Sequence, residues 1–586
     1  MTPAGKRDLI ALAVIAAAVA AVFGRTCFFS EMISDDVIYV EHRHLLVLSW
    51  ENLRHWSRPV LGLWGPLTGY SFMLDRLVWG PEHFMFGARL MNVLLHFAGA
   101  AAFFFALRQL RFSTLWAALT VLFWAVHPLR AESVAWLSER KDVLVVSLGL
   151  WSIALFIRFM RRGGRRLFAL SLICFAATFF VKPALVGLPG VITAYLWGRY
   201  RSTKAALYLK YSGPYWLVSL VWSAVYKLVF APVVTTGSEG LGRTLAVVGW
   251  RYGMYFLKTF VPSGLNPFYP HFSFENDSLF PMYLAGVVIV VLLALVRREN
   301  AMAAYVYLPL LLCFTAAVFP ALFMIGDVDL ADRYSYFPGV FAVTGSAVLL
   351  CSLIRRRPGT AKAVAAAASA SVLLMGVLCA RQVSVWETQE TYMAAALSVP
   401  KPNYRSLFTD AVLKFEKGDL PGVRRDIDFL RENYGDLSAH RRKIITFFTT
   451  SLDGILLIRS DRTAEGMKKL ERVIWNPAWE LLVCTPYGYP RHVLLTAAGV
   501  YQKAGMRKAA AEIYRRTAKL YGTFEPLENE FYLALAALCL GDRAEALARF
   551  EKAQSFNPDD ENIRRNIAAL KAAMGARPAA RGVEKK

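Results

Sequence analysis

The pattern of hydrophobic and polar residues divides the chain into two parts. From Met1 to about Arg381, long apolar runs rich in Leu, Val, Ala, Phe and Trp alternate with short charged loops. After Arg381 no apolar run reaches the roughly 20 residues that a helix needs to cross a bilayer, and charged residues recur every few positions. The pattern therefore predicts an all-α protein in which a polytopic membrane helix bundle precedes a helical domain outside the membrane.

About eleven apolar runs have the composition of membrane-spanning helices. They cover residues 8–28, 86–107, 113–128, 142–160, 166–181, 184–199, 208–231, 281–297, 302–325, 336–354 and 362–381. The run Val247–Val261 is interpreted instead as an interfacial or re-entrant helix. Counting it as a span would place Arg297 and Arg298 on the opposite side of the membrane from the other basic loops.

The basic residues between these runs predict the orientation of the bundle, because cytoplasmic loops carry an excess of Lys and Arg. Lys6 and Arg7 precede the first run, which no convincing cleavage site follows, so we expect this run to be retained. With the N-terminus in the cytoplasm, the strong basic clusters all fall on the cytoplasmic side, in the loops Arg108–Arg111, Arg158–Arg166, Arg199–Lys210, Arg297–Asn300 and Arg355–Lys362. The C-terminal domain is then extracytoplasmic, and the compact basic loops favour a bacterial inner membrane.

After the membrane domain, residues 1–381, comes a predicted linker, residues 382–402, and then a helical-repeat domain, residues 403–576. Its repeat length of about 34 residues is typical of tetratricopeptide hairpins, which stack into an α-solenoid. The clearest unit has small, aromatic and turn residues at the expected offsets, namely Ala534, Gly541, Ala546, Phe550, Ala553 and Pro558. An earlier unit has Ala498, Tyr501, Gly505, Ala510 and Tyr514 at matching offsets. Such repeats recruit a peptide or another extended partner, or serve as a spacer without a ligand. Residues 577–586 are predicted to be a disordered basic tail.

Composition and charge support the membrane interpretation. Hydrophobic residues make up 56% of the chain and charged residues only 19%, against about a quarter in soluble proteins. The net charge of +24 does not indicate nucleic-acid binding, because many of the basic residues sit in short loops between apolar runs, where they anchor the helices. Cys484 and Cys539 lie in the repeat domain and could pair if that domain is extracytoplasmic.

Acidic residues gather on the predicted outer face of the membrane domain. Asp35 and Asp36 follow the first span directly, and adjacent carboxylates that repel each other are expected where a proton or a metal is handled. They are therefore candidates for a general base or for the ligands of a divalent cation. The alternative is a pair of solvated loop acids.

Isolated basic residues lie on the same predicted face. Arg140, Lys141, Lys182 and Arg333 could hold an anionic headgroup, although snorkelling at the membrane interface explains each of them equally well. Supporting roles are expected for His127, Glu132 and Asp332, the first two by orienting their loop through hydrogen bonds. No nucleotide-binding, zinc or serine-hydrolase motif is evident.

Six short segments resemble those of a known protein family, in the same order, and together they span nearly the whole membrane domain. They are SDDVIYV (34–40), GPLTGYSFMLD (65–75), NVLLH (92–96), HPLRAESVAWLSERKDVL (127–144), VKPALVGLP (181–189) and ADRYSYFP (331–338). In these segments the chain resembles the transmembrane and tetratricopeptide-repeat glycosyltransferases. That family is a branch of the C-type membrane glycosyltransferases that includes protein O-mannosyltransferases.

The resemblance implies a donor sugar carried on a polyprenyl phosphate and used on the outer face with inversion at the anomeric carbon. It also implies that an Asp in the first outer loop deprotonates the acceptor hydroxyl, which here is Asp35 or Asp36. From charge and sidedness, the four outer basic residues are candidates for the donor phosphate. The predicted function is thus a glycosyltransferase whose repeats recruit a protein acceptor. The alternatives are a non-catalytic membrane scaffold that binds partners through its repeats, and a transporter of lipid-linked sugars.

Overall fold

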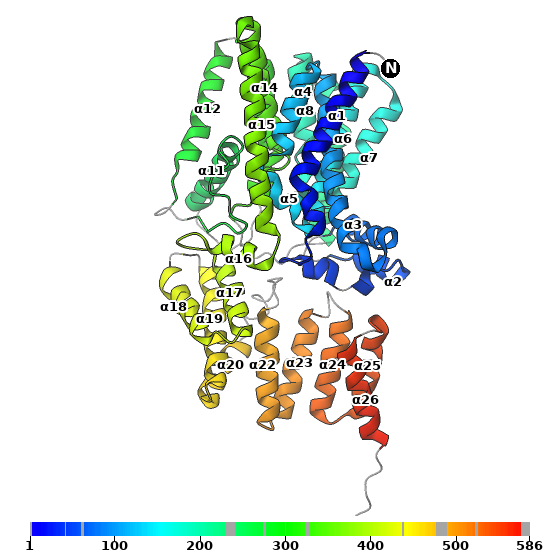
Figure 1. Ribbon diagram of the computed structural model, residues 1–586, viewed down its shortest axis with the longest axis vertical. Helices are drawn as coiled ribbons and strands as arrows, with labels where there is room; N and C mark the ends of the chain where they lie inside the picture. The colour runs from blue at the N-terminus through cyan, green and yellow to red at the C-terminus, as the bar shows by residue number, and fades with distance from the viewer. Residues whose placement is uncertain are drawn as a thin grey trace, which may run out of the picture. The chain divides into compact units, whose positions relative to one another are not determined.

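The computed structural model of the chain describes residues 3–41, 43–59, 64–229, 241–272, 277–298, 300–322, 329–435, 437, 439–475, 489–521, 526–558 and 560–575. All the regular structure in these residues is helical, which confirms the predicted all-α class. The chain forms two compact units, Met1–Ser406 and Leu407–Lys586. Figure 1 shows the long helices of the first unit and the short helical hairpins of the second.

The first unit contains the apolar helices and several short ones. In chain order they are α1 (Pro3–Phe23), α2 (Trp50–Trp56), α3 (Pro66–Gln109), α4 (Thr114–Ala125), α5 (Ala131–Ala135), α6 (Arg140–Arg162), α7 (Arg165–Phe179), α8 (Leu188–Tyr200), α9 (Ala205–Tyr211), α10 (Gly213–Val229), α11 (Leu241–Lys258), α12 (Phe280–Arg297), α13 (Leu308–Leu322), α14 (Gly339–Arg356), α15 (Ala361–Val383) and α16 (Gln389–Leu397).

The described helices fit an integral membrane protein. Within the described residues each of the eleven predicted runs falls on helical structure, and the last residues of two runs, 230–231 and 323–325, lie outside them. Among the described residues, seven helical stretches are long and apolar enough to cross a membrane. These are Gly5–Phe28, Pro66–Gln109, Leu137–Arg162, Phe280–Arg297, Ala303–Pro320, Gly339–Arg356 and Pro358–Trp386. Two runs that we expected to be separate spans, α7 and α8, have 15 and 13 residues and meet at a bend of 120°, so neither is long enough alone. The count of eleven spans therefore stays a prediction.

Two local features interrupt the regular bundle. In α3 the helix is broken at Gly80, which has φ +68°, because Pro81 has no N–H to continue the ladder of hydrogen bonds. The run Val247–Val261 lies mainly on α11, which is not among the seven long apolar helices. In Figure 1 α11 lies across the direction of α12 and α14, an arrangement in keeping with an interfacial helix.

The ends of the helices that carry basic loops gather at one end of the bundle. Asp8, near the start of α1, accepts a hydrogen bond from Arg108 Nε at 2.9 Å and another from Thr114 Oγ1 at 2.7 Å. In Figure 1 the turn between α14 and α15 lies at this same end of the bundle as the N-terminus. The site residues lie in loops and helix starts at the opposite end. Which end faces the cytoplasm stays a prediction.

The second unit consists of antiparallel helical hairpins. Its helices are α17 (Tyr404–Glu416, which begins in the first unit), α18 (Leu420–Asn433), α19 (Ala439–Arg459), α20 (Thr463–Ile474), α22 (Tyr489–Lys503), α23 (Arg507–Tyr521), α24 (Pro526–Leu540), α25 (Arg543–Phe556) and α26 (Glu561–Gly575). The predicted small and aromatic positions Ala534, Ala546, Phe550 and Ala553 are fully buried, and Gly541 turns the chain between α24 and α25 with φ +84°. The tail 577–586 and Cys484 lie outside the described residues.

Candidate functional site

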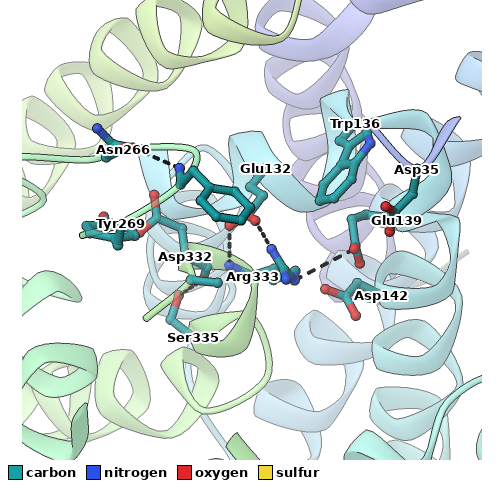
Figure 2. Close-up of polar contacts among 12 residues, drawn as sticks. Asp35, Glu132, Trp136, Glu139, Asp142, Asn266, Tyr269, Asp332, Arg333 and Ser335 are labelled. Atoms are coloured by element: carbon teal, nitrogen blue, oxygen red, sulfur yellow. Dashed lines mark hydrogen bonds and ion pairs between the residues drawn. The ribbon is translucent and has the colours of Figure 1, made fainter. Parts of the chain in front are cut away.

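The first unit brings residues from four distant segments together at the end of the bundle opposite the N-terminus (Figure 2). One segment follows α1, a second leads through α5 into α6, a third joins α7 to α8, and a fourth precedes α14. Together they supply five carboxylates and three cations, namely Asp35, Glu132, Glu139, Asp142, Asp332, Lys141, Lys182 and Arg333.

The two adjacent carboxylates of the first outer loop have different surroundings. Asp36 is 1% exposed, and both of its oxygens accept backbone hydrogen bonds, from Ser138 N at 2.7 Å and from Ile33 N at 3.1 Å. Asp35 lies 3.9 Å from Lys141 Nζ through Oδ2, and its Oδ1 has no hydrogen-bond partner in the described part of the chain. Asp36 thus ties two loops together, whereas Asp35 keeps an oxygen free to accept a proton.

Burial sets the electrostatics of both carboxylates. It raises the pKa of Asp35 above its ordinary value, and the positive charge of Lys141 lowers that pKa in part. It raises the pKa of Asp36 to about 6, against the charge of Arg89 and the two backbone hydrogen bonds. A carboxylate with a raised pKa is a stronger base than a solvated one, which suits Asp35 to proton abstraction.

The three cations of the site are each paired with carboxylates. Lys141 Nζ lies 3.2 Å from Glu139 Oε1, and Lys182 Nζ lies 2.8 Å from Asp142 Oδ1. Arg333 pairs with Glu132 through Nη1, and its Nε lies 3.7 Å from Glu139 Oε1. These pairs hold the cations in place in a largely buried site, as Figure 2 shows for Arg333.

Aromatic rings separate these cations. Lys141 lies over the rings of Tyr39 and Trp136, at 5.3 and 5.7 Å from their centroids. Arg333 lies 5.6 Å from the Trp136 ring and 4.9 Å from the Tyr334 ring, which also lies 5.4 Å from Lys182 Nζ. Cations over aromatic faces are stabilised without losing their charge, so these rings help to hold the three side chains in the buried site.

Arg140, the fourth predicted phosphate ligand, points elsewhere. Its side chain is fully buried and pairs with Asp75 at 2.7 Å. It also donates to Asn92 and to Ser71 Oγ, and its guanidinium lies 4.6 Å from the Phe72 ring centroid. This set of partners favours a structural role, in which Arg140 joins the start of α6 to both halves of α3.

The three predicted supporting residues all fasten loops. His127 Nδ1 accepts from Leu129 N at 3.3 Å and so begins the turn that leads to α5. Glu132 binds both the guanidinium and the backbone N–H of Arg333. Asp332 accepts a hydrogen bond of 2.6 Å from the Tyr269 hydroxyl.

Asp35 and Asp36 are the predicted ligands of a divalent cation. In the described part of the chain, no group of three or more His, Cys, Asp or Glu residues is arranged to hold a metal ion. Both oxygens of Asp36 are already used by backbone N–H groups. A divalent cation at this pair therefore stays a prediction without support from the geometry.

Several residues of the site were not predicted from the sequence. Glu139 and Asp142 lie three positions apart around the start of α6, a spacing that places them on one side of the helix only when the start of the helix is known. Tyr269 and Trp136 carry no charge and resemble ordinary aromatic residues of a membrane protein. Only their contacts with Asp332, Lys141 and Arg333 connect them to the site.

No protein-family model and no curated protein sequence matches this chain. Among solved structures, the chain is similar to the crystal structure of the Archaeoglobus fulgidus oligosaccharyltransferase, tethered through a disulfide bond with an acceptor peptide containing the NVT sequon. The match has 14% identity and a TM-score of 0.35, and covers 71% of this chain and 59% of that chain. The chain thus spans less than two thirds of that enzyme, and a similarity of this degree does not identify its activity.

Proposed function

We propose that this chain is an integral membrane glycosyltransferase that moves a sugar from a polyprenyl-phosphate donor to an acceptor hydroxyl on the extracytoplasmic side. The observation that carries the proposal is the arrangement around Asp35. This carboxylate has a free oxygen and a pKa raised by burial, and it lies beside a set of cations held between aromatic rings. A base next to an anion-binding group is what transfer from a phosphate ester to a hydroxyl requires.

In the proposed reaction Asp35 takes the proton of the acceptor hydroxyl. The hydroxyl oxygen then forms a bond to the anomeric carbon, on the side opposite the leaving phosphate, which inverts the configuration. The bond between this carbon and the phosphate oxygen breaks, and its electron pair leaves with the polyprenyl phosphate. Lys141, Lys182 and Arg333 stabilise the negative charge that develops on that phosphate.

The rest of the chain suits this reaction. The helices long enough to cross a membrane would place the site beside the lipid bilayer, in which the polyprenyl tail of the donor can lie. From the basic loops we propose that the chain lies in a bacterial inner membrane with its N-terminus in the cytoplasm. The hairpins of the second unit are proposed to be tetratricopeptide-like repeats that recruit a protein acceptor.

The test is sugar transfer from a panel of labelled polyprenyl-phosphate sugars in membranes that hold equal amounts of wild type, Asp35→Asn and the surface variant Glu465→Gln. We expect transfer by the wild type and by Glu465→Gln, and a loss of about 10² to 10⁴ in Asp35→Asn, the usual contribution of a general base. Equal transfer by all three proteins would remove Asp35 from the mechanism. An absence of transfer by the wild type with every donor and peptide acceptor would favour the scaffold instead. Repeating the assay with EDTA, and then with Mg²⁺ or Mn²⁺ restored, decides whether a divalent cation participates.

A further inference from the structure

The segment after the last apolar helix, residues 384–406, packs within the first unit although the sequence predicts a linker over 382–402. It is helical over Ser384–Trp386 and in α16. Trp386 is 1% exposed, and its indole stacks on that of Trp136 with ring centroids 5.2 Å apart and an interplanar angle of 17°. A buried stack of two indoles fixes the orientation of both rings.

The positions that follow Trp386 hold the first outer loop. Glu387 pairs with Arg25, and Gln389 N donates to Glu31 Oε2 at 2.7 Å. The segment therefore contacts the loop that carries Asp35 as well as the loop that carries Trp136.

Trp136 connects this segment with the charged groups of the site. Its ring lies 5.7 Å from Lys141 Nζ and 5.6 Å from the Arg333 guanidinium. Its indole N–H donates to Ile33 O at 3.0 Å, two residues before Asp35. A shift of the Trp136 ring would therefore move two cations and the loop of the base together.

The far end of the same segment reaches the site by a second route. Asn403 is fully buried, and its Nδ2 donates to Tyr269 O at 2.9 Å. The Tyr269 hydroxyl in turn donates to Asp332, next to Arg333.

From these contacts we propose that Trp386 is a positioning residue of the sugar-transfer site. It acts through Trp136, holding Lys141 and Arg333 where they bind the donor phosphate. The segment 384–406 is then part of the framework of the site and not a passive connection to the repeats. This inference rests on the proposed function, because it needs the two cations to bind a phosphate.

The test compares Trp386→Leu, Trp386→Phe and Trp50→Leu with the wild type, all as full chains purified in detergent. Trp50 is 64% exposed, so Trp50→Leu makes the same chemical change at an exposed position. The probe is polyprenyl monophosphate without a sugar, and its dissociation constant is measured for each protein together with the thermal midpoint. We expect about tenfold weaker binding in Trp386→Leu, recovery to within about twofold in Trp386→Phe, and no change in Trp50→Leu.

Unchanged binding by a folded Trp386→Leu would overturn the inference. So would binding that weakens in both the Leu and the Phe variant only in proportion to the stability that each has lost. If Trp386→Leu does not fold, the series Trp386→Phe and Trp386→His replaces it, and binding is expected to weaken as the stacked ring becomes smaller. A wild type that does not bind polyprenyl monophosphate would refute the proposed donor and the inference with it. A wild type that binds and transfers sugar, with variants that bind equally well, would refute the inference alone.

Discussion

Glu132 and Arg333 are 201 residues apart and are joined by two bonds at once. Glu132 Oε1 pairs with the guanidinium of Arg333, while Glu132 Oε2 accepts a hydrogen bond of 2.8 Å from the backbone N–H of the same residue. The pair locks the loop before α14 onto α5. It also sets the position of a cation that we assign to the donor phosphate.

Truncation of this pair is expected to destabilise the membrane unit strongly. Glu132→Ala leaves the Arg333 guanidinium with only its longer pair to Glu139 and leaves the backbone N–H without an acceptor, and breaking a buried ion pair typically costs about 3–5 kcal/mol. Thermal unfolding in detergent measures the loss, and Glu132→Gln, which keeps an acceptor for the N–H, should lose less. A midpoint equal to that of the wild type in Glu132→Ala would show that the loop is held by other contacts.

Asp36→Asn is expected to lower the yield of folded protein and not the activity of each folded molecule. The Asn side chain has one acceptor oxygen, so one of the two N–H groups, of Ile33 or Ser138, faces an amide donor at a cost of about 1–3 kcal/mol. Sugar transfer normalised to the folded, monodisperse fraction is the measurement. Transfer per folded molecule that collapses in Asp36→Asn but persists in Asp35→Asn would exchange the roles of the two residues.

The sequence predicted the helices much better than it predicted the roles of single residues. Apolar runs determine where membrane helices form, so every predicted run falls on a helix. The difference between Asp35 and Asp36, however, depends on the backbone N–H of Ser138, which lies 102 residues from Asp36. No local pattern contains that information.

Two further differences have the same cause. Arg140 and Lys141 are adjacent at the start of α6, so their side chains project in different directions. Arg140 pairs with Asp75, whereas Lys141 lies beside Asp35. The segment 382–402 is too short and too polar to predict a buried structure. The stack between Trp386 and Trp136 becomes visible only when the two loops are placed side by side.

The rate of transfer is expected to depend on pH through Asp35. Its pKa is raised by burial, so the base becomes protonated, and transfer declines, at a higher pH than for a solvated carboxyl of pKa about 4. Because the charge of Lys141 lowers this pKa, Lys141→Gln should move the acid limb to still higher pH. The pH profile of kcat at saturating donor measures both effects. An acid limb that stays in place in Lys141→Gln would contradict the coupling of these two groups.

The second unit has a charged centre of its own at Asp453. This carboxylate is 2% exposed and is contacted by Arg424, Lys469 and, at 3.3 Å, by Arg431 Nη2. Burial would raise its pKa, but the hydrogen bonds from Lys469 and Arg424 outweigh burial and hold the pKa below its ordinary value. The three cations come from α18 and α20 and surround an acid on α19, so the cluster joins three consecutive helices of the second unit.

Asp453→Asn is therefore expected to destabilise the full chain at neutral pH, by about 1–3 kcal/mol, since hydrogen bonds to a charged group are lost while the cations remain partly solvated. A depressed pKa in the folded state stabilises the protein above the pKa of the unfolded carboxyl, near 4, and this contribution disappears as the pH falls through the folded value. The stability difference between wild type and Asp453→Asn should thus narrow as the pH is lowered from 7 towards 3. Thermal unfolding of the second unit within the full chain, followed by circular dichroism or by limited proteolysis, measures this difference. Glu465→Gln is the matched control, because Glu465 belongs to an exposed pair with Arg462, and its removal should leave the unfolding midpoint unchanged at every pH. A difference for Asp453→Asn that is constant with pH would mean that the carboxylate charge does not hold these helices together.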